Sequence, residues 1–191
     1  MEVFNKNLVG YRYNPERARA LMAEAGYQHG FDGAFSLDIR DSEVAVARAE
    51  YIKRCLERLG IAIELHPMPW KDFLEKGYRG ESLFSMKGWV SDNGDPDNFL
   101  YPLFHSKSFG RAGNTSFYRR DEVDDLIDRA RAERNSKKRN SMYQHIEELI
   151  VNDAPWIFLC HGLDSYAVAK NIHGFKIDPF GIVRFRYLWS T

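Results

Sequence analysis

Two short stretches of alternating apolar residues, FSLDI and IAIEL, constrain the fold more than any other feature of this sequence. In the first stretch Phe35, Leu37 and Ile39 alternate with polar residues, and residues 61–65 repeat the pattern. Between the two stretches, apolar residues recur at helical spacing after Ser42 and before Gly60. A strand, a helix and a strand in this order form a right-handed βαβ unit with parallel strands. The sequence therefore predicts an α/β protein with a mixed sheet and flanking helices.

Other segments carry equally local signals. Asn14 and Pro15 mark the start of a helix that ends near Gly26, and its apolar face is expected to pack on a core. SLFSMKGW is predicted to be a third strand, and two amphipathic helices are predicted before Pro155. The apolar faces of these two helices consist of Val123, Leu126, Ile127 and Ala130, and of Met142, Ile146, Leu149 and Ile150. WIFLC, SYAVA and GIVRFRYLW are predicted to be strands or extended segments.

Charge and cysteine content exclude several classes of protein. The 191 residues include 27 Lys and Arg against 27 Asp and Glu, so the sequence predicts no nucleic-acid or anionic-membrane partner. No apolar run is long enough to span a membrane, and the N-terminus has no export signal. Taken alone this indicates the cytoplasm, but it indicates nothing about location if the chain is a fragment. Cys55 and Cys160 are predicted to be buried thiols, with their disulfide state left open.

The segment GWVSDNGDPDNFLYPLF, from Gly88 to Phe104, is the strongest candidate for a functional site. It does not fit a calcium-binding EF-hand loop, because Asp97 and Leu103 occupy the positions of the required glycine and glutamate. The carboxylates have no neighbouring Ser or His that would form a catalytic set, and Cys160 beside His161 is interpreted as a core thiol. We therefore predict no catalytic residue, no metal site and no cofactor.

Two interpretations of this segment remain. Asn, Gly, Asp and Pro are turn residues, so the segment could be a simple surface turn. That interpretation leaves the aromatic residues on both sides unexplained. An aspartate displayed at a strand end beside an indole is suited to binding a cationic amine through a charge-assisted hydrogen bond.

Several motifs resemble the family 5 extracellular solute-binding proteins, which include the peptide-, nickel- and haem-binding components of ABC importers. GWVSDNGDPDNF is similar to the loop of the dipeptide-binding branch, and YNPERARALMAEAGY is similar to a helix of the family. ERLGIAIEL with PWKDFLEK, and the C-terminal GFKIDPFGIVRF, match further family segments. The resemblance covers essentially the whole chain.

The resemblance implies the C-terminal lobe of a type II, periplasmic-binding-protein-like clamp of two lobes. Residues 1–162 are then expected to form this lobe, and residues 163–191 to cross back and pack on the other lobe. By position, Asp92 matches an aspartate that pairs with the α-amino group of a peptide, and Trp89 matches a tryptophan that lines the cleft. Arg40 falls within one residue of an arginine that receives the ligand carboxylate. Gly88 and Asn93 complete the predicted ligand-binding set, whereas Asp95 and Asp97 are predicted to cap turns and a helix.

The resemblance also implies partners and a location. The expected ligand is a dipeptide or short oligopeptide, and the expected protein partner is an inner-membrane ABC permease. The location is expected to be periplasmic or otherwise extracytoplasmic, by export or by a lipid tether. Haem, a nickel chelate, glutathione or an opine remain alternative ligands, and a carboxylate-dependent hydrolase is the alternative from another class. The apolar residues of GIVRFRYLW predict either self-association or folding of this segment back onto its own lobe.

Overall fold

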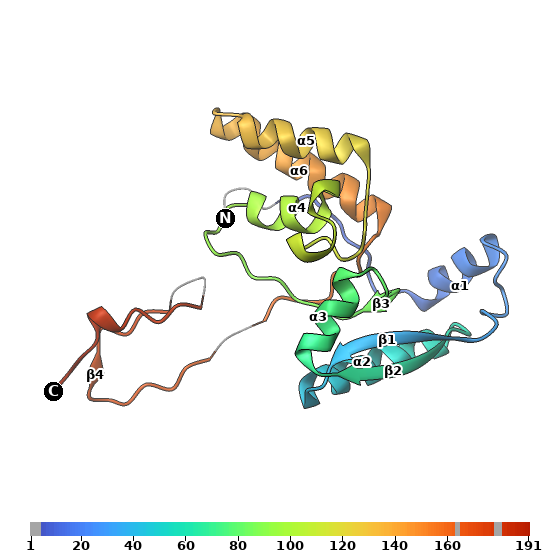
Figure 1. Cartoon of the computed structure of the whole chain (residues 1–191), viewed down its shortest axis with the longest axis horizontal. Coiled ribbons are helices and arrows are strands. Elements are labelled where there is room, and N and C mark those ends of the chain that lie inside the picture. Colours follow the sequence, from blue (N-terminus) through green and yellow to red (C-terminus); the bar gives the residue numbers. More distant parts are fainter. Residues whose placement is uncertain (1–4, 163–164, 178–180) are drawn as a thin grey trace.

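The computed structural model describes residues 5–162, 165–177 and 181–191. Figure 1 shows a sheet with its helix in one layer, a group of helices in another, and a C-terminal segment that extends away from both. The main elements are α1 (Pro15–Glu24), β1 (Ala34–Arg40), α2 (Glu43–Glu57), β2 (Ala62–Met68), α3 (Trp70–Tyr78), β3 (Phe84–Ser85), α4 (Asp97–Phe104), α5 (Asp121–Ala132), α6 (Ser136–Asp153), β4 (Ile172–His173) and β5 (Trp189–Ser190). Short 3₁₀ turns occupy Ser106–Ser108, Gly110–Ala112 and Phe185–Tyr187.

The predicted βαβ unit is confirmed. Strands β1 and β2 are parallel over seven residue pairs, from Ala34 with Ala62 to Arg40 with Met68, and α2 connects them. Leu37, Ile39, Ala49 and Ile63 form the buried core between helix and sheet. The helix begins as expected, because the Ser42 side chain accepts a hydrogen bond from the Ala45 N–H at 3.3 Å.

The signals at the ends of α1 are also confirmed. The Asn14 side chain accepts a hydrogen bond from the Arg17 N–H at 2.9 Å, and Pro15 occupies the first turn. Gly26 and Gly60, just beyond the ends of α1 and α2, adopt φ angles of 87° and 77°. Only glycine adopts such left-handed conformations without strain, which explains why both helices stop there.

The third strand is much shorter than the predicted SLFSMKGW. Among the described residues the sheet has the order β2-β1-β3 and is parallel throughout rather than mixed, and β3 spans only Phe84–Ser85. The Met86 N–H still donates to the Asp38 carbonyl at 3.1 Å, after which the chain leaves the sheet. Beyond this point the Trp89 indole donates to the Asn98 carbonyl at 2.8 Å and holds the chain against α4.

The second core belongs to α4, α5 and α6. The two predicted amphipathic helices are confirmed as α5 and α6, and they pack with α4. The buried residues of this core are Leu100, Leu103, Phe104, Val123, Ile127, Ala130, Tyr143, Ile146 and Ile150. Helix α6 ends at Asp153, where Ala154 adopts a left-handed conformation immediately before Pro155.

Two expectations about burial are wrong for the described residues. Helix α1 buries none of its side chains, and Leu21 on its apolar face is 46% exposed. Of the three segments predicted to be strands or extended, WIFLC and SYAVA form no strand, and GIVRFRYLW contributes a 3₁₀ turn and β5, which pairs antiparallel with β4. Cys160 is an exposed free thiol and Cys55 is a half-buried one, because WIFLC finds no sheet to join. Residues 163–164 and 178–180, which lie just before SYAVA and GIVRFRYLW, are outside the described residues.

Candidate functional site

The loop between β3 and α4 is built from its own polar side chains. Ser91 Oγ accepts the Gly94 N–H at 2.8 Å, and Asn93 Oδ1 accepts the Asp95 N–H at 2.9 Å. Asn98 Oδ1 accepts the Asp92 N–H at 2.8 Å from the far side of the loop. These bonds are the Ser and Asn turn motifs that the residue types predict, and they fix the backbone of the loop.

Asp95 and Asp97 hold this loop to the helical layer. Asp95 Oδ1 accepts the Asp97 N–H at 2.9 Å and so satisfies a free donor at the start of α4. The Asp95 carboxylate also forms a two-pronged ion pair with Arg139 of α6, at 2.8 and 2.9 Å. The hydrogen bonds from Arg139 are the main reason that the pKa of Asp95 lies below its ordinary value. Asp97 Oδ1 lies 3.2 Å from Arg131 Nε, close enough for an ion pair though not aligned as a hydrogen bond. The capping role predicted for these two aspartates is confirmed for Asp95, whereas the contact of the Asp97 carboxylate is the ion pair with Arg131.

Asp92 differs from its two neighbours. Its side chain is exposed, and within the described ranges its carboxylate has no hydrogen bond or ion pair. The backbone beneath it is fixed by Asn98, so the carboxylate is presented from a rigid turn. This arrangement suits the binding of an external cation, because no internal partner has to be displaced.

Trp89 lies beside this carboxylate in the chain. The residue is 37% exposed, and its indole N–H is already satisfied by the Asn98 carbonyl. The Lys87 ammonium lies 5.7 Å from the centre of the indole ring. A partly exposed indole held in one orientation can line a binding cleft.

The other three predicted site residues have different surroundings. Gly88 and Asn93 are exposed in the loop, and Asn93 acts there as a turn residue through its bond to Asp95. Arg40 lies at the C-terminal end of β1, and its guanidinium lies 5.9 Å from the centre of the Trp70 ring on α3. Because β1 and β3 are parallel neighbours, Arg40 and the start of the loop lie at the same edge of the sheet.

Lys87 was not among the predicted site residues. It precedes Gly88 and Trp89, is half-buried, and lines a small cavity beneath α3. Its signal in the sequence is a charged residue that directly follows Leu83, Phe84 and Met86 in the predicted third strand.

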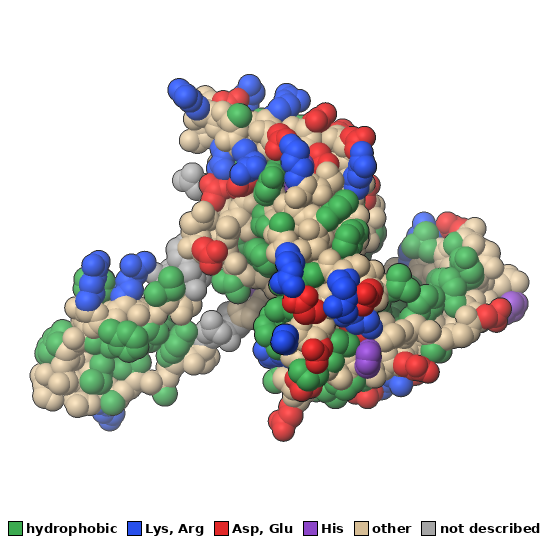
Figure 2. All heavy atoms as spheres, in the orientation of Figure 1, with side chains coloured by type: hydrophobic (Ala, Val, Ile, Leu, Met, Phe, Trp, Pro, Cys, Tyr) green, Lys and Arg blue, Asp and Glu red, His purple; other side chains and the backbone are tan. Residues whose placement is uncertain are grey.

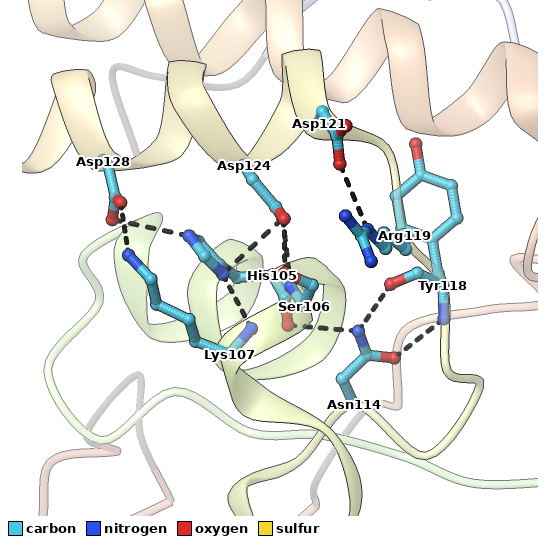
Figure 3. A network of polar contacts seen from close by, with 9 residues as sticks. All are labelled: His105, Ser106, Lys107, Asn114, Tyr118, Arg119, Asp121, Asp124 and Asp128. Carbon is cyan, nitrogen blue, oxygen red and sulfur yellow. Dashed lines mark hydrogen bonds and ion pairs between the residues drawn. The ribbon is translucent and has the colours of Figure 1, made fainter.

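A second polar network joins the end of α4 to α5, and it is structural (Figure 3). The buried His105 accepts the Lys107 N–H on Nδ1 at 3.0 Å, so its proton sits on Nε2, 3.4 Å from Asp128 Oδ1. Asp124 accepts the backbone N–H and the hydroxyl of Ser106. These hydrogen bonds and ion pairs hold the end of α4 and the turn after it against α5.

In the part of the chain that the structure describes, no cluster of His, Cys, Asp or Glu is arranged to hold a metal ion. That same part contains no helix long and apolar enough to cross a membrane.

Comparisons with known proteins identify the family of this chain. The family model described as "Bacterial extracellular solute-binding proteins, family 5 Middle" matches residues 2–111. The chain is 33% identical to heme-binding protein A of Haemophilus influenzae over 181 residues, which is 93% of this chain and 33% of that protein. It is 31% identical to the dipeptide-binding protein of Escherichia coli K12, again over 93% of this chain and over 34% of that protein.

Solved structures of similar proteins share the fold. The periplasmic binding protein DppA from Helicobacter pylori, in complex with the peptide STSA, superposes with a TM-score of 0.82 and 26% identity, over 98% of this chain and 36% of that one. HbpA2 from Haemophilus parasuis gives a TM-score of 0.82 at 30% identity, over 98% of this chain and 38% of that one. The expected α/β fold of a type II periplasmic-binding-protein lobe is confirmed. This chain spans about a third of the length of these relatives, and it belongs to the bacterial extracellular solute-binding proteins, family 5.

Proposed function

We propose that this chain is the ligand-binding lobe of a two-lobe solute receptor that captures dipeptides or short oligopeptides for an ABC importer. The observation that carries the proposal is the Asp92 carboxylate, which is exposed, unpaired among the described residues and presented from a rigid turn next to Trp89. In the same loop Asp95 and Asp97 are both engaged by arginines. The E. coli dipeptide-binding protein and the peptide-bound H. pylori protein support this reading by similarity.

The physical role of Asp92 follows from its setting. A peptide carries an ammonium group at its N-terminus, and a carboxylate with no internal partner can pair with it without first breaking another contact. When a second lobe closes over the site, water leaves and the attraction between the two charges strengthens. Extended peptides are otherwise held by main-chain hydrogen bonds, with side chains in tolerant and partly wet pockets. The same cleft can then accept many side chains.

The proposal includes the organisation of the whole receptor. Residues 1–162 form the lobe that contacts ligand, and residues 163–191 cross to the second lobe. The receptor is extracytoplasmic and delivers its ligand to a membrane permease. Its role is binding rather than catalysis, which agrees with the family as a class of solute-binding proteins.

Haem is the second candidate ligand. The similarity to heme-binding protein A, at 33% identity, supports it as directly as the dipeptide-binding protein supports a peptide. The exposed Asp92 favours the peptide, because haem has no amine group to pair with that carboxylate. An indole such as Trp89 would suit either ligand.

Calorimetry on the two-lobe form of the protein tests the role of Asp92. Free dipeptides should bind, whereas N-acetylated dipeptides should bind much more weakly. Asp92→Ala should remove about 3–5 kcal/mol of dipeptide binding free energy, because the buried ammonium is left without a partner. Asp125→Ala is the matched control, since Asp125 is an exposed aspartate on α5, away from the loop.

Two results would contradict the proposal. If Asp92→Ala binds dipeptides as tightly as the wild-type protein, Asp92 does not pair with the ligand. If only haem binds, and does so equally well in Asp92→Ala, the receptor is a haem binder and Asp92 is a turn residue.

A further inference from the structure

The lobe contains two separate hydrophobic cores, one between α2 and the sheet and one among α4, α5 and α6 (Figure 1). We call β1, α2, β2, α3 and β3 the sheet half. The helical half consists of α4, α5 and α6 with residues 105–118, which Ser106 fastens to Asp124 of α5. Among the described elements, the most extensive contact between the halves is that of α3 with the 3₁₀ turn Gly110–Ala112. The seam between α3 and residues 109–117 is therefore the main place where packing can hold the two halves together.

Glycines bring the two sides of the seam unusually close. A Cβ atom added to Gly110 would lie 2.7 Å from the Tyr78 carbonyl oxygen, and one added to Gly80 would lie 2.9 Å from the Phe117 ring. Both glycines have left-handed backbone conformations, with φ angles of 69° and 70°. Any larger side chain at either position would push α3 and residues 109–117 apart.

Phe117 adopts a backbone conformation that aromatic residues rarely take. Its φ angle is 52°, in the left-handed region. The fully buried Asn114 holds this conformation, because its Oδ1 accepts the Tyr118 N–H at 3.2 Å just beyond Phe117 (Figure 3). Such strain persists only where the surrounding structure maintains it. Its result here is that the Phe117 ring lies against Gly80, across the seam.

Two basic side chains also cross the seam. Arg111 Nη2 lies 2.6 and 2.7 Å from the two carboxylate oxygens of Glu75 on α3, and the guanidinium lies 5.1 Å from the centre of the Tyr78 ring. From the other side, Lys87 Nζ lies 3.4 Å from the Gly113 carbonyl. This bridging contact gives a structural reason for a half-buried lysine just after β3.

The seam matters for the candidate site because the loop that carries Asp92 is fastened to the helical half. The Trp89 indole donates to the Asn98 carbonyl at the start of α4, and Asp95 pairs with Arg139 of α6. The edge of the sheet beside this loop belongs to the sheet half. A change in the angle between the halves would therefore move the loop relative to the sheet even if both cores stayed intact.

We propose that Phe117 and Arg111 form a latch that couples the two halves into one cooperative unit and thereby positions the loop that carries Asp92. Both are positioning residues, since neither has to touch a ligand. A coupled lobe presents the loop in one orientation, so less ordering is needed when a ligand binds. The effect on ligand binding rests on the proposed function, whereas the coupling of the two halves does not.

Hydrogen exchange on the 191-residue chain tests the coupling in Phe117→Asn and Arg111→Gln. Asparagine tolerates the left-handed conformation, so the first change removes the ring without adding strain. In wild-type protein the slowest amides of α2 and of α6 should exchange through one common opening. In each variant the two halves should open separately, with protection in one half on the order of tenfold below that in the other.

Two matched variants serve as controls. Arg79→Gln removes an exposed arginine–glutamate pair of similar geometry, with distances of 2.7 and 2.9 Å to Glu81, but this pair lies on one side of the seam. Phe117→Tyr keeps an aromatic ring at the seam. Both controls should leave the halves coupled. If the halves remain coupled in Phe117→Asn or in Arg111→Gln, or open separately in wild-type protein, the latch is overturned.

Calorimetry on the two-lobe protein tests the positioning of the loop. Phe117→Asn and Arg111→Gln should bind a dipeptide on the order of tenfold more weakly than wild-type protein, whereas Arg79→Gln and Phe117→Tyr should bind it as wild-type protein does. Unchanged affinity in variants whose halves open separately would overturn the positioning role. If wild-type protein binds no dipeptide, the proposed function fails, and hydrogen exchange still decides whether the latch exists.

Discussion

At the scale of single residues, Asp38 shows how far burial can depart from a strand pattern. Alternation in FSLDI places Asp38 on the face opposite Leu37 and Ile39, yet all three side chains are buried. The Asp38 carboxylate accepts hydrogen bonds from Lys76 Nζ at 2.8 Å and from Ser82 Oγ at 2.5 Å. It also lies 2.9 Å from His66 Nδ1. One carboxylate thus ties β1 to β2, to α3 and to the segment before β3.

The charge of Asp38 should make the protein sensitive to acid. Burial alone would raise the pKa of Asp38, but the hydrogen bonds from Lys76, Ser82 and His66 together hold it below its ordinary value of 3.8. A lowered pKa in the folded state stabilises the fold at pH above 3.8, and that stability is lost as the pH falls through the lowered value.

Asp38→Asn tests this prediction. At pH 7 it should lower the free energy of unfolding by about 3–5 kcal/mol, because Lys76 is left without its carboxylate. Urea denaturation between pH 6 and pH 2 should then show a shallower acid-induced loss of stability for Asp38→Asn than for the wild-type protein. Asp125→Asn, on the surface of α5, serves as the control and should follow the wild-type curve. Parallel wild-type and Asp38→Asn curves would falsify the role of Asp38.

At the scale of elements, the loop before α4 depends on a helix that lies far along the chain. Arg139 of α6 donates two hydrogen bonds to the Asp95 carboxylate. It also donates to Tyr143 Oη at 3.0 Å and to the Ala130 carbonyl at 3.2 Å. The guanidinium therefore connects the loop, α5 and α6 at one point. The rigidity of the turn that presents Asp92 comes partly from this connection.

Arg139→Lys should separate the charge of this residue from its geometry. Lysine keeps the positive charge but cannot form the two parallel bonds to Asp95. We expect the free energy of unfolding to fall by about 1–3 kcal/mol and dipeptide affinity to weaken, because the loop is held less firmly. Asp95→Asn and the double variant complete a thermodynamic cycle by chemical denaturation and calorimetry. If the two single changes add without coupling, the ion pair does not hold the loop.

At the scale of the whole molecule, large apolar side chains are exposed to solvent in the C-terminal segment. Ile182, Phe185, Tyr187 and Trp189 in the C-terminal segment are each more than half exposed. Figure 2 shows hydrophobic side chains gathered across this segment, with Lys and Arg at its margins. The segment contacts the rest of the molecule little, as its position in Figure 1 also shows. A monomer rarely exposes such a surface, so it should be covered by a second lobe or by another copy of the chain.

Removal of residues 163–191 tests whether this segment is separate from the lobe. The truncated chain should unfold cooperatively, with a free energy of unfolding within about 1 kcal/mol of that of the 191-residue chain, because few contacts cross between the two parts. Light scattering after size-exclusion chromatography should show the 191-residue chain associating as its concentration rises, whereas the truncated chain stays monomeric. A large loss of stability on truncation would instead show that the segment belongs to the lobe.

The sequence by itself determined the local elements and the family of this protein. The βαβ unit, the caps at Asn14 and Ser42, the helix stops at glycine and the turn chemistry near Asp92 all depend on residues close together in the chain. Patterns of spacing record such interactions directly, and the loop motif was specific enough to identify the family. For Asp95 the sequence predicted only a capping role. It did not predict the ion pair with an arginine, because that arginine lies 44 residues away along the chain.

Only the tertiary structure decided which polar groups have partners. Asp38 is buried because α3 and Ser82 reach it from other parts of the chain, and beyond β3 the Trp89 indole bonds to the Asn98 carbonyl. Lys87 is half-buried without a counter-ion, and the apolar face of α1 remains uncovered. The ion pairs, hydrogen bonds and burial of these side chains depend on segments that are far apart in the sequence and come together only in the folded chain. No local sequence pattern shows which of these segments will meet.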